Sequence, residues 1–275
     1  MLRSLQTLQN YTLGASDGDI GRVSDLYFDD KAWVVRYLVV QTGTWLSDRK
    51  VLISPFSVGV PDSAHQRLPV RISREQVKNS PDIDTEQPVS RQHETQYSDY
   101  YGYPYYWGGD GMWGDGLYYP SMVVPRLAGS ARAQALEAEV AAVYAKADAK
   151  RKEEADPHLR STEAVVGYHI QASDGDLGHV QGMLVDEETW AIRYLVVDTS
   201  NWWVGHQVLI APPWITAINW SESKVHVNLT QQAIKDSPRF EASEELNRKH
   251  EADLYRYYDR PTYWEREHNR MLIDA

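Results

Sequence analysis

The chain has 275 residues, 42% of them hydrophobic, so it is long and apolar enough to bury one or two cores. Cysteine is absent, which excludes disulfides, thiolate metal sites and cysteine nucleophiles, and fits a reducing compartment. The formal net charge of −11 disfavours nucleic acids and anionic membrane surfaces as partners. The first six residues lack the apolar stretch of a signal peptide, and no window reaches the roughly 18 apolar residues of a membrane span. We therefore expect a cytoplasmic protein that does not insert into a membrane.

The sequence contains a long internal repeat. At a shift of 157 positions, residues 11–107 align with residues 168–264 without a gap, and 33 of the 97 pairs are identical. Unrelated segments would share only a handful of identities, so the chain is a tandem duplication. The identical stretches include Ala-Ser-Asp-Gly-Asp, at 15–19 and 172–176, and Arg-Tyr-Leu-Val-Val, at 36–40 and 193–197.

Short strands are predicted along each copy. The Asp-Gly step within the turn 16–19 is a strong hairpin signal, because glycine adopts a positive φ cheaply. Ser73 is the expected N-cap of a brief helix over 74–79, which Pro81 ends. The strands are predicted over residues 20–28, 33–40, 50–53 and 68–72. Strands of this length and spacing indicate a small barrel or sandwich that hides its edges by closing on itself.

A tail and a linker follow the first set of strands. The tail carries Arg-x-His-Glu at 91–94 and an aromatic group ending at Trp107, and both recur in the second copy, so we expect a helix or an extended arm that lays aromatic rings on the barrel. A Gly-rich loop over 108–116 and a helix over 131–154 come next, with an apolar stripe at helical spacing. The predicted domains are therefore 1–107, 108–160 and 161–275.

Three motifs of the repeat resemble the PRC-barrel family. They are Asp-Gly-x-x-Gly-x-Val at 17–23, Phe-Asp-Asp-x-x-Trp-x-Val-Arg-Tyr-Leu-Val-Val at 28–40, and Val-Leu-Ile-Ser-Pro at 51–55. The family is named for the cytoplasmic domain of the H subunit of the purple-bacterial photosynthetic reaction centre, and it includes the C-terminal domain of a ribosome maturation factor. The resemblance implies a mainly β chain of two small PRC-type barrels in tandem, with short helices and a helical linker, acting as an interaction module. The layout is most similar to that of the bacterial proteins that carry two such barrels.

Several polar residues of the repeat have both a functional and a structural interpretation. The aspartates Asp17/Asp19 and Asp174/Asp176 could ligate a divalent cation, but the six or more oxygens that such ions need are not in sight, so hairpin-turn chemistry is favoured. The His-Glu steps at 93–94 and 250–251 lack the second histidine of a metalloprotease motif, which favours surface histidines. We therefore expect no metal ion and no cofactor. The residues assigned a structural role are Asp17, Gly18, Gly21, Arg36, Asp174, Gly175, Gly178 and Arg193.

For the arginines and the aromatic groups, a role in binding a partner is also considered. Arg36 and Arg193 could bind an anion, but pairing with a carboxylate such as Asp29 or Asp186 is favoured. The Tyr and Trp clusters could stack on bases or a flat pigment, but packing on the barrel or on a protein is favoured. One loop carries Trp45 and Leu46 in the first copy and Trp202 and Trp203 in the second. Each pair is either a hot-spot anchor for a protein partner or a plug at one end of the barrel, and the sequence does not decide between them.

No nucleophile elbow, phosphate-binding loop or dinucleotide fingerprint occurs in the sequence. The favoured hypothesis is therefore a non-enzymatic scaffold that binds an unidentified protein partner, either with its two barrels packed on each other or within a homodimer. A ribosome- or RNA-associated maturation factor is the first alternative, and it rests on fold analogy alone. Binding of a small ligand or a metal ion between the barrels is the second.

Overall fold

The structure is a computed structural model that describes residues 1–81, 89, 91–107, 111–114, 120, 158–199, 206–241 and 246–273. The helix expected over 131–154, most of the Gly-rich loop, Trp202 and Trp203 lie outside the described residues. The chain divides into two compact units. Unit 1 comprises Met1, Arg3–Ala164 and Val185–Ile192, and unit 2 comprises Leu2, Val165–Leu184 and Arg193–Ala275. Unit 1 therefore includes a short piece of the second repeat.

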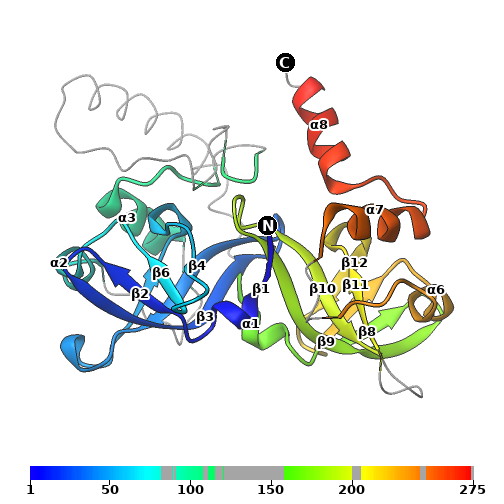
Figure 1. The fold of residues 1–275 in the computed structure, drawn as a ribbon, viewed down its shortest axis with the longest axis horizontal. Helices are drawn as coiled ribbons and strands as arrows, with labels where there is room; N and C mark the ends of the chain where they lie inside the picture. Colours follow the sequence, from blue (N-terminus) through cyan, green and yellow to red (C-terminus); the bar gives the residue numbers. More distant parts are fainter. Residues whose placement is uncertain are drawn as a thin grey trace. The chain divides into compact units, whose positions relative to one another are not determined.

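The sheet of unit 1 has the strand order β5-β4-β3-β2-β6, with β7 pairing with β3. All neighbours are antiparallel except β2 and β6, which run parallel. Figure 1 shows β2, β3, β4 and β6 in blue and cyan. The strands of this sheet are β2 (Thr12–Ala15), β3 (Gly18–Asp29), β4 (Val34–Gln41), β5 (Lys50–Ile53), β6 (Arg67–Pro69) and β7 (Leu159–Ser161), whereas β1 (Leu2–Ser4) pairs with β9 (Gly175–Asp186) of the other sheet.

The mainly β prediction is confirmed, and three of the four strands predicted in the first copy are found close to their expected bounds. The fourth is shorter than predicted, because β6 ends at Pro69 and Val70 makes only an isolated bridge to Val58. Among the described residues the ladder does not close into a continuous ring. Instead, the chain leaves β5 through the 3₁₀ turn η2 (Pro55–Ser57) and returns to the other side of the sheet at Val58.

The core of unit 1 lies between the strands and the helices that cover them. Leu13, Ile20, Leu26, Leu38 and Ile53 are 0% exposed, and burial of each contributes about 1.5–3 kcal/mol. Strand β4 is buried along nearly its whole length, which explains why its sequence shows an apolar run instead of an alternation. The core therefore follows directly from the hydrophobic pattern.

Short helices close the sheet of unit 1. They are α1 (Leu5–Leu8), η1 (Thr44–Leu46), α2 (Arg74–Lys78), α3 (Arg91–Tyr101) and α5 (Thr162–Val165). Helix α2 begins with the predicted cap: the Ser73 hydroxyl accepts the Gln76 amide at 3.1 Å, and the Gln76 side chain accepts the Ser73 amide at 2.8 Å. The tail is a helix, α3, in place of an extended arm.

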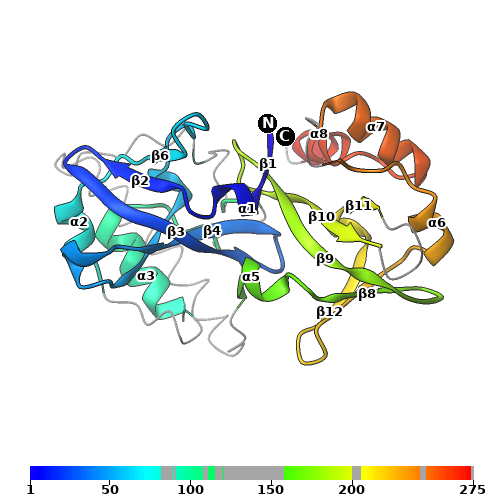
Figure 2. The same ribbon diagram turned by 60° about the horizontal axis from the view of Figure 1, so that its bottom comes forward.

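Unit 2 follows the same plan, with the strand order β11-β10-β9-β8-β13-β12. Figure 2 shows the long β9 and the hairpin of β12, which follows the 3₁₀ turn η4 (Pro212–Trp214). Its strands are β8 (His169–Ala172), β9 (Gly175–Asp186), β10 (Ile192–Asp198), β11 (Gln207–Ile210), β12 (Ile215–Asn219) and β13 (Lys224–Val227). Its helices are α6 (Gln231–Lys235), α7 (Arg248–Tyr257) and α8 (Tyr263–Ile273).

Within the part of the chain that the structure describes, none of the helices combines the length and the apolar character needed to span a membrane.

Candidate interaction site

The loop that carries Trp45 packs on its own barrel. The indole Nε1–H of Trp45 donates to the Ile20 carbonyl at 2.6 Å, and the guanidinium carbon of Arg74 lies 4.2 Å from the ring centre. Trp45 and Leu46 are both half-buried. The indole thus bonds to its own barrel through its N–H and remains partly accessible to solvent, an arrangement compatible with a plug and with an anchor. Trp202 and Trp203, the equivalent pair, lie outside the described residues.

The Asp-Gly turns are hairpin ends that also hold a helix. The Asp17 carboxylate accepts the amide of Arg74, the first residue of α2, at 2.8 Å, and Asp174 accepts the amide of Gln231 at 2.7 Å in unit 2. The bond from Arg74 lowers the pKa of the Asp17 carboxyl. Both aspartates therefore act as helix-capping acceptors, which agrees with the interpretation as turn residues.

The glycines of these turns are required by their backbone. Gly18 and Gly175 have φ values of +133° and +151°, where side chains are strained. Gly21 and Gly178 allow close approach of the neighbouring strand, because a Cβ at these positions would lie 2.0 Å from the Gln41 carbonyl oxygen and 1.9 Å from that of Asp198. The first glycine of the motif therefore allows the turn, and the second allows the close approach of the neighbouring strand.

Arg36 lies at the centre of a buried cluster in unit 1. Its guanidinium donates to the Met112 carbonyl at 2.6 Å and to the Asp29 carboxylate at 3.3 Å, so the pairing with Asp29 expected from the sequence is present. The rings of Tyr106 and Trp113 cover it, with centres 3.9 and 4.7 Å from the guanidinium carbon. Burial lowers the pKa of the Arg36 guanidinium. The cluster ties the aromatic tail to β4.

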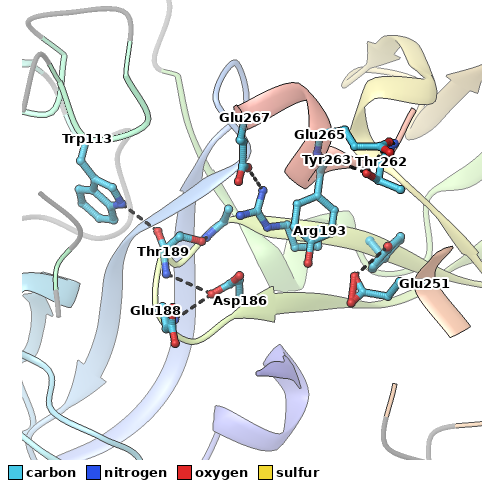
Figure 3. Close-up of polar contacts among 12 residues, drawn as sticks. Trp113, Asp186, Glu188, Thr189, Arg193, Glu251, Thr262, Tyr263, Glu265 and Glu267 are labelled. Atoms are coloured by element: carbon cyan, nitrogen blue, oxygen red, sulfur yellow. Dashed lines mark hydrogen bonds and ion pairs between the residues drawn. The ribbon is translucent and has the colours of Figure 1, made fainter. Parts of the chain in front are cut away.

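Arg193 occupies the equivalent position in unit 2, but its partner comes from a different element. It forms an ion pair with Glu267 of α8, and the Tyr263 ring centre lies 4.1 Å from its guanidinium carbon. Figure 3 shows Glu267 and Tyr263 both converging on Arg193. The same arginine thus holds a loop in one repeat and a helix in the other.

Unit 1 also holds the β9–β10 turn of the second repeat. The Val35 amide donates to the Trp190 carbonyl at 2.9 Å, and the Ile192 amide donates to the Trp33 carbonyl at 2.7 Å. The Trp113 indole donates to the Thr189 carbonyl at 2.8 Å (Figure 3). Main-chain hydrogen bonds of this kind provide the affinity when a strand of one protein binds to a sheet edge of another.

The short strands β1 and β7, which precede the first and the second repeat, also contact turns: β7 contacts the β3–β4 turn, and β1 contacts the β9–β10 turn. The Asp30 amide donates to the His158 carbonyl at 2.9 Å, where β7 begins, and the Glu187 amide donates to the Met1 carbonyl at 3.0 Å. Arg160 pairs with Asp30 at 2.8 Å, and Arg3 pairs with Glu187. These contacts all lie inside unit 1.

A comparison with protein-family models decides the identity of the first barrel. The model of the PRC-barrel domain matches residues 13–77. The first repeat contains a PRC-barrel domain. The match runs from β2 to α2, so it includes the Asp-Gly turn, Arg36 and the Trp45 loop of this PRC barrel. No curated protein is significantly similar to the chain.

The tail that follows the PRC barrel places a buried carboxylate against β4, which the sequence did not predict. Glu94, 2% exposed, accepts hydrogen bonds from the hydroxyls of Tyr37, at 3.2 Å, and of Tyr106. Glu251 of unit 2 accepts from Tyr194 at 3.1 Å in the same way. A sequence signal existed, because the glutamate and the tyrosine keep their spacing in both copies.

The histidines beside these glutamates are exposed, as expected. His93 and His250 lie on the outer faces of α3 and α7. Among the described residues of both units, no group of three or more His, Asp or Glu side chains could hold a metal ion.

Proposed function

We propose that this protein is a non-enzymatic assembly scaffold built from two PRC barrels, the second of which is the second repeat. The support is the family match in the first repeat, the 157-residue alignment of the second, and the common strand plan. The proposal retains the cytoplasmic location expected from the sequence, which fits the lack of cysteine.

One observation carries the proposal. The PRC barrel of unit 1 binds chain segments from outside its own repeat, through main-chain hydrogen bonds at the β3–β4 turn and through β7 on the edge of β3. The conspicuous charged groups of the barrel, Arg36 and Asp29, are engaged in holding the tail. A module with these properties is suited to organising polypeptide segments.

The test is affinity capture from an extract of the source cell with the full chain as bait. Trp45→Ala removes the indole that is half in solvent, and His65→Ala, in another loop of the same barrel where the side chain is 78% exposed, is the matched control. We expect a defined set of proteins that binds the wild type and the control but is lost with Trp45→Ala. Thermal melts of both variants check that the fold is intact.

Two outcomes would contradict the proposal in different ways. If the bait retains nothing beyond the empty matrix, the scaffold function fails. If the captured set is the same for Trp45→Ala and for the wild type, the scaffold function stands and its binding face is not the Trp45 loop.

A further inference from the structure

We propose that the β3–β4 turn is a self-recognition surface, which binds the corresponding turn and N-terminal strand of a second copy of the same barrel. The inference rests on the proposed scaffold function and names the partner of one surface. Within one chain that partner is the second repeat, so the full chain satisfies the surface internally and does not need another chain for it.

The main-chain contacts are self-complementary. The two bonds Val35 to Trp190 and Ile192 to Trp33 exchange places when 157 is added to or subtracted from each residue number, and the antiparallel bridge between Val34 and Ala191 maps onto itself. Each copy therefore presents one donor and one acceptor to the other. This is the property of an isologous contact, in which the same surface serves on both sides.

The contacts of β1 and β7 are also related to each other by the shift of 157 positions. The bond from Asp30 to the residue before β7, His158, corresponds to the bond from Glu187 to Met1, before β1. The ion pairs correspond in the same way, because the pair of Arg160 with Asp30 is related to the pair of Arg3 with Glu187 by the shift of 157 positions. The tripeptide Leu-Arg-Ser stands in both strands, at 2–4 and 159–161. A chance contact would not repeat four interactions at one sequence shift.

The β3–β4 turn is preorganised for this contact. The Asp29 carboxylate accepts the amides of Lys31 and Ala32 at 3.0 and 3.1 Å, and Trp33 follows in the left-handed region with φ of 56°. This backbone is fixed by bonds within the turn itself. Because the turn needs no partner to take its shape, little ordering entropy opposes the contact.

The second turn has the same internal bonds. Asp186 accepts the amides of Glu188 and Thr189 at 2.9 and 3.2 Å (Figure 3), and Trp190 has φ of 57°.

Burial at the centre of the contact makes separation unfavourable. Val34 is 0% exposed and Ala191 is 3% exposed, while Trp190 is 4% exposed. Opening the contact would expose these apolar groups and leave the amides of Val35 and Ile192 without protein acceptors. Because the two repeats are covalently linked, their pairing within one chain is unimolecular, which favours the internal pair over a second chain.

Disulfide trapping in the full chain tests the inference, and the absence of native cysteine makes the readout clean. Antiparallel bridge partners have Cα atoms about 4.5–5.5 Å apart, within the range that a disulfide accepts. We expect Val34→Cys with Ala191→Cys to oxidise to a cross-linked monomer, at least tenfold faster than to a disulfide-linked dimer. The single variants, which can form only interchain disulfides, should remain monomeric under the same oxidant.

Failure to cross-link, or formation of interchain dimers by the double variant, would overturn the inference. Amide hydrogen exchange on the unsubstituted chain covers the case in which the double variant does not fold: slow exchange at Val35 and Ile192 supports the contact, and exchange as fast as that of an open turn refutes it.

The proposed function is judged separately. If the cross-link is absent while the Trp45-dependent capture persists, only self-recognition fails; if the cross-link forms and nothing is captured, only the scaffold function fails.

Discussion

Gly21 lies where β3 passes the end of β4, and there is no room for a methyl group on its Cα. Relief of the 2.0 Å contact with the Gln41 carbonyl requires the strands to separate, so Gly21→Ala should cost about 3 kcal/mol and lower the Tm by roughly 10 °C. The matched control is Gly102→Ala, where open space surrounds the Cα and only the positive φ of 67° opposes the substitution. Thermal melts by circular dichroism compare the two, and equal losses would contradict the steric explanation.

Glu251 makes the stability of unit 2 depend on pH. Burial raises the pKa of its carboxyl, and hydrogen bonds from neighbours such as Tyr194 offset the effect only in part. A carboxyl with a raised folded pKa holds its proton more tightly in the folded state, so stability falls as the pH rises through its titration. Glu251→Gln cannot ionise, so its Tm relative to the wild type should increase between about pH 4 and about pH 7.

Glu265 provides a control of opposite sign on the same unit. Its carboxylate accepts the Thr262 amide at 2.9 Å and the Thr262 hydroxyl at 2.7 Å, and these bonds lower the pKa of the Glu265 carboxyl. The stabilisation is present above the unfolded pKa and disappears as the pH falls through the folded pKa. Glu265→Gln should therefore be less stable than the wild type near neutral pH, with a difference that shrinks in acid. Parallel trends for the two variants would refute one of the two assignments, and the direction of the shared trend would show which.

At the scale of elements, the buried Tyr97 hydroxyl helps to attach helix α3 to the barrel. The Tyr97 hydroxyl donates to the Leu52 carbonyl at 2.9 Å and accepts the Ser54 amide at 3.0 Å. Tyr97→Phe leaves both backbone groups buried without a partner, which should cost about 1–3 kcal/mol. Tyr100→Phe removes an exposed hydroxyl that donates to the Gln76 carbonyl at 2.8 Å and should cost less than about 1 kcal/mol. Urea unfolding of both variants checks the order, and a larger loss for Tyr100→Phe would be contrary to this attachment.

The elements that the sequence predicted well are those governed by local rules. The Asp-Gly turn, the buried run of β4 and the Ser73 cap each depend on residues within a few positions, so their bounds were nearly correct. Strand β7 was missed because a three-residue strand has no periodicity and exists only through its pairing with β3. The role of Glu94 was missed for a similar reason, since its partner Tyr37 lies 57 residues away. Distant pairing leaves little trace in a single sequence.

At the scale of the whole molecule, the repeat and the compact unit are different divisions of the chain. The repeat is a unit of sequence, whereas unit 1 takes Val185–Ile192 from the second repeat, and its long segment ends at Ala164, inside α5. The Leu-Arg-Ser tripeptides at 2–4 and 159–161 were the available signal, and they lie outside the aligned 97 residues. Their reciprocal contacts explain why a strand at the start of one repeat belongs with the turn of the other.

The last prediction concerns residues 1–107 as a separate fragment. It keeps the β3–β4 turn and the strand Leu2–Ser4, but it lacks β7 and the β9–β10 turn, so Val35 and the edge of β3 lose their partners. Because the contact is self-complementary, a second fragment supplies the missing groups. The fragment should give a β-rich far-ultraviolet spectrum and a dimer by size-exclusion chromatography with light scattering. A fragment of residues 6–107 keeps the turn without the strand, and should therefore dimerise more weakly. A folded, strictly monomeric 1–107 would show that the turn does not recognise its own copy, because nothing else in the fragment competes for that surface.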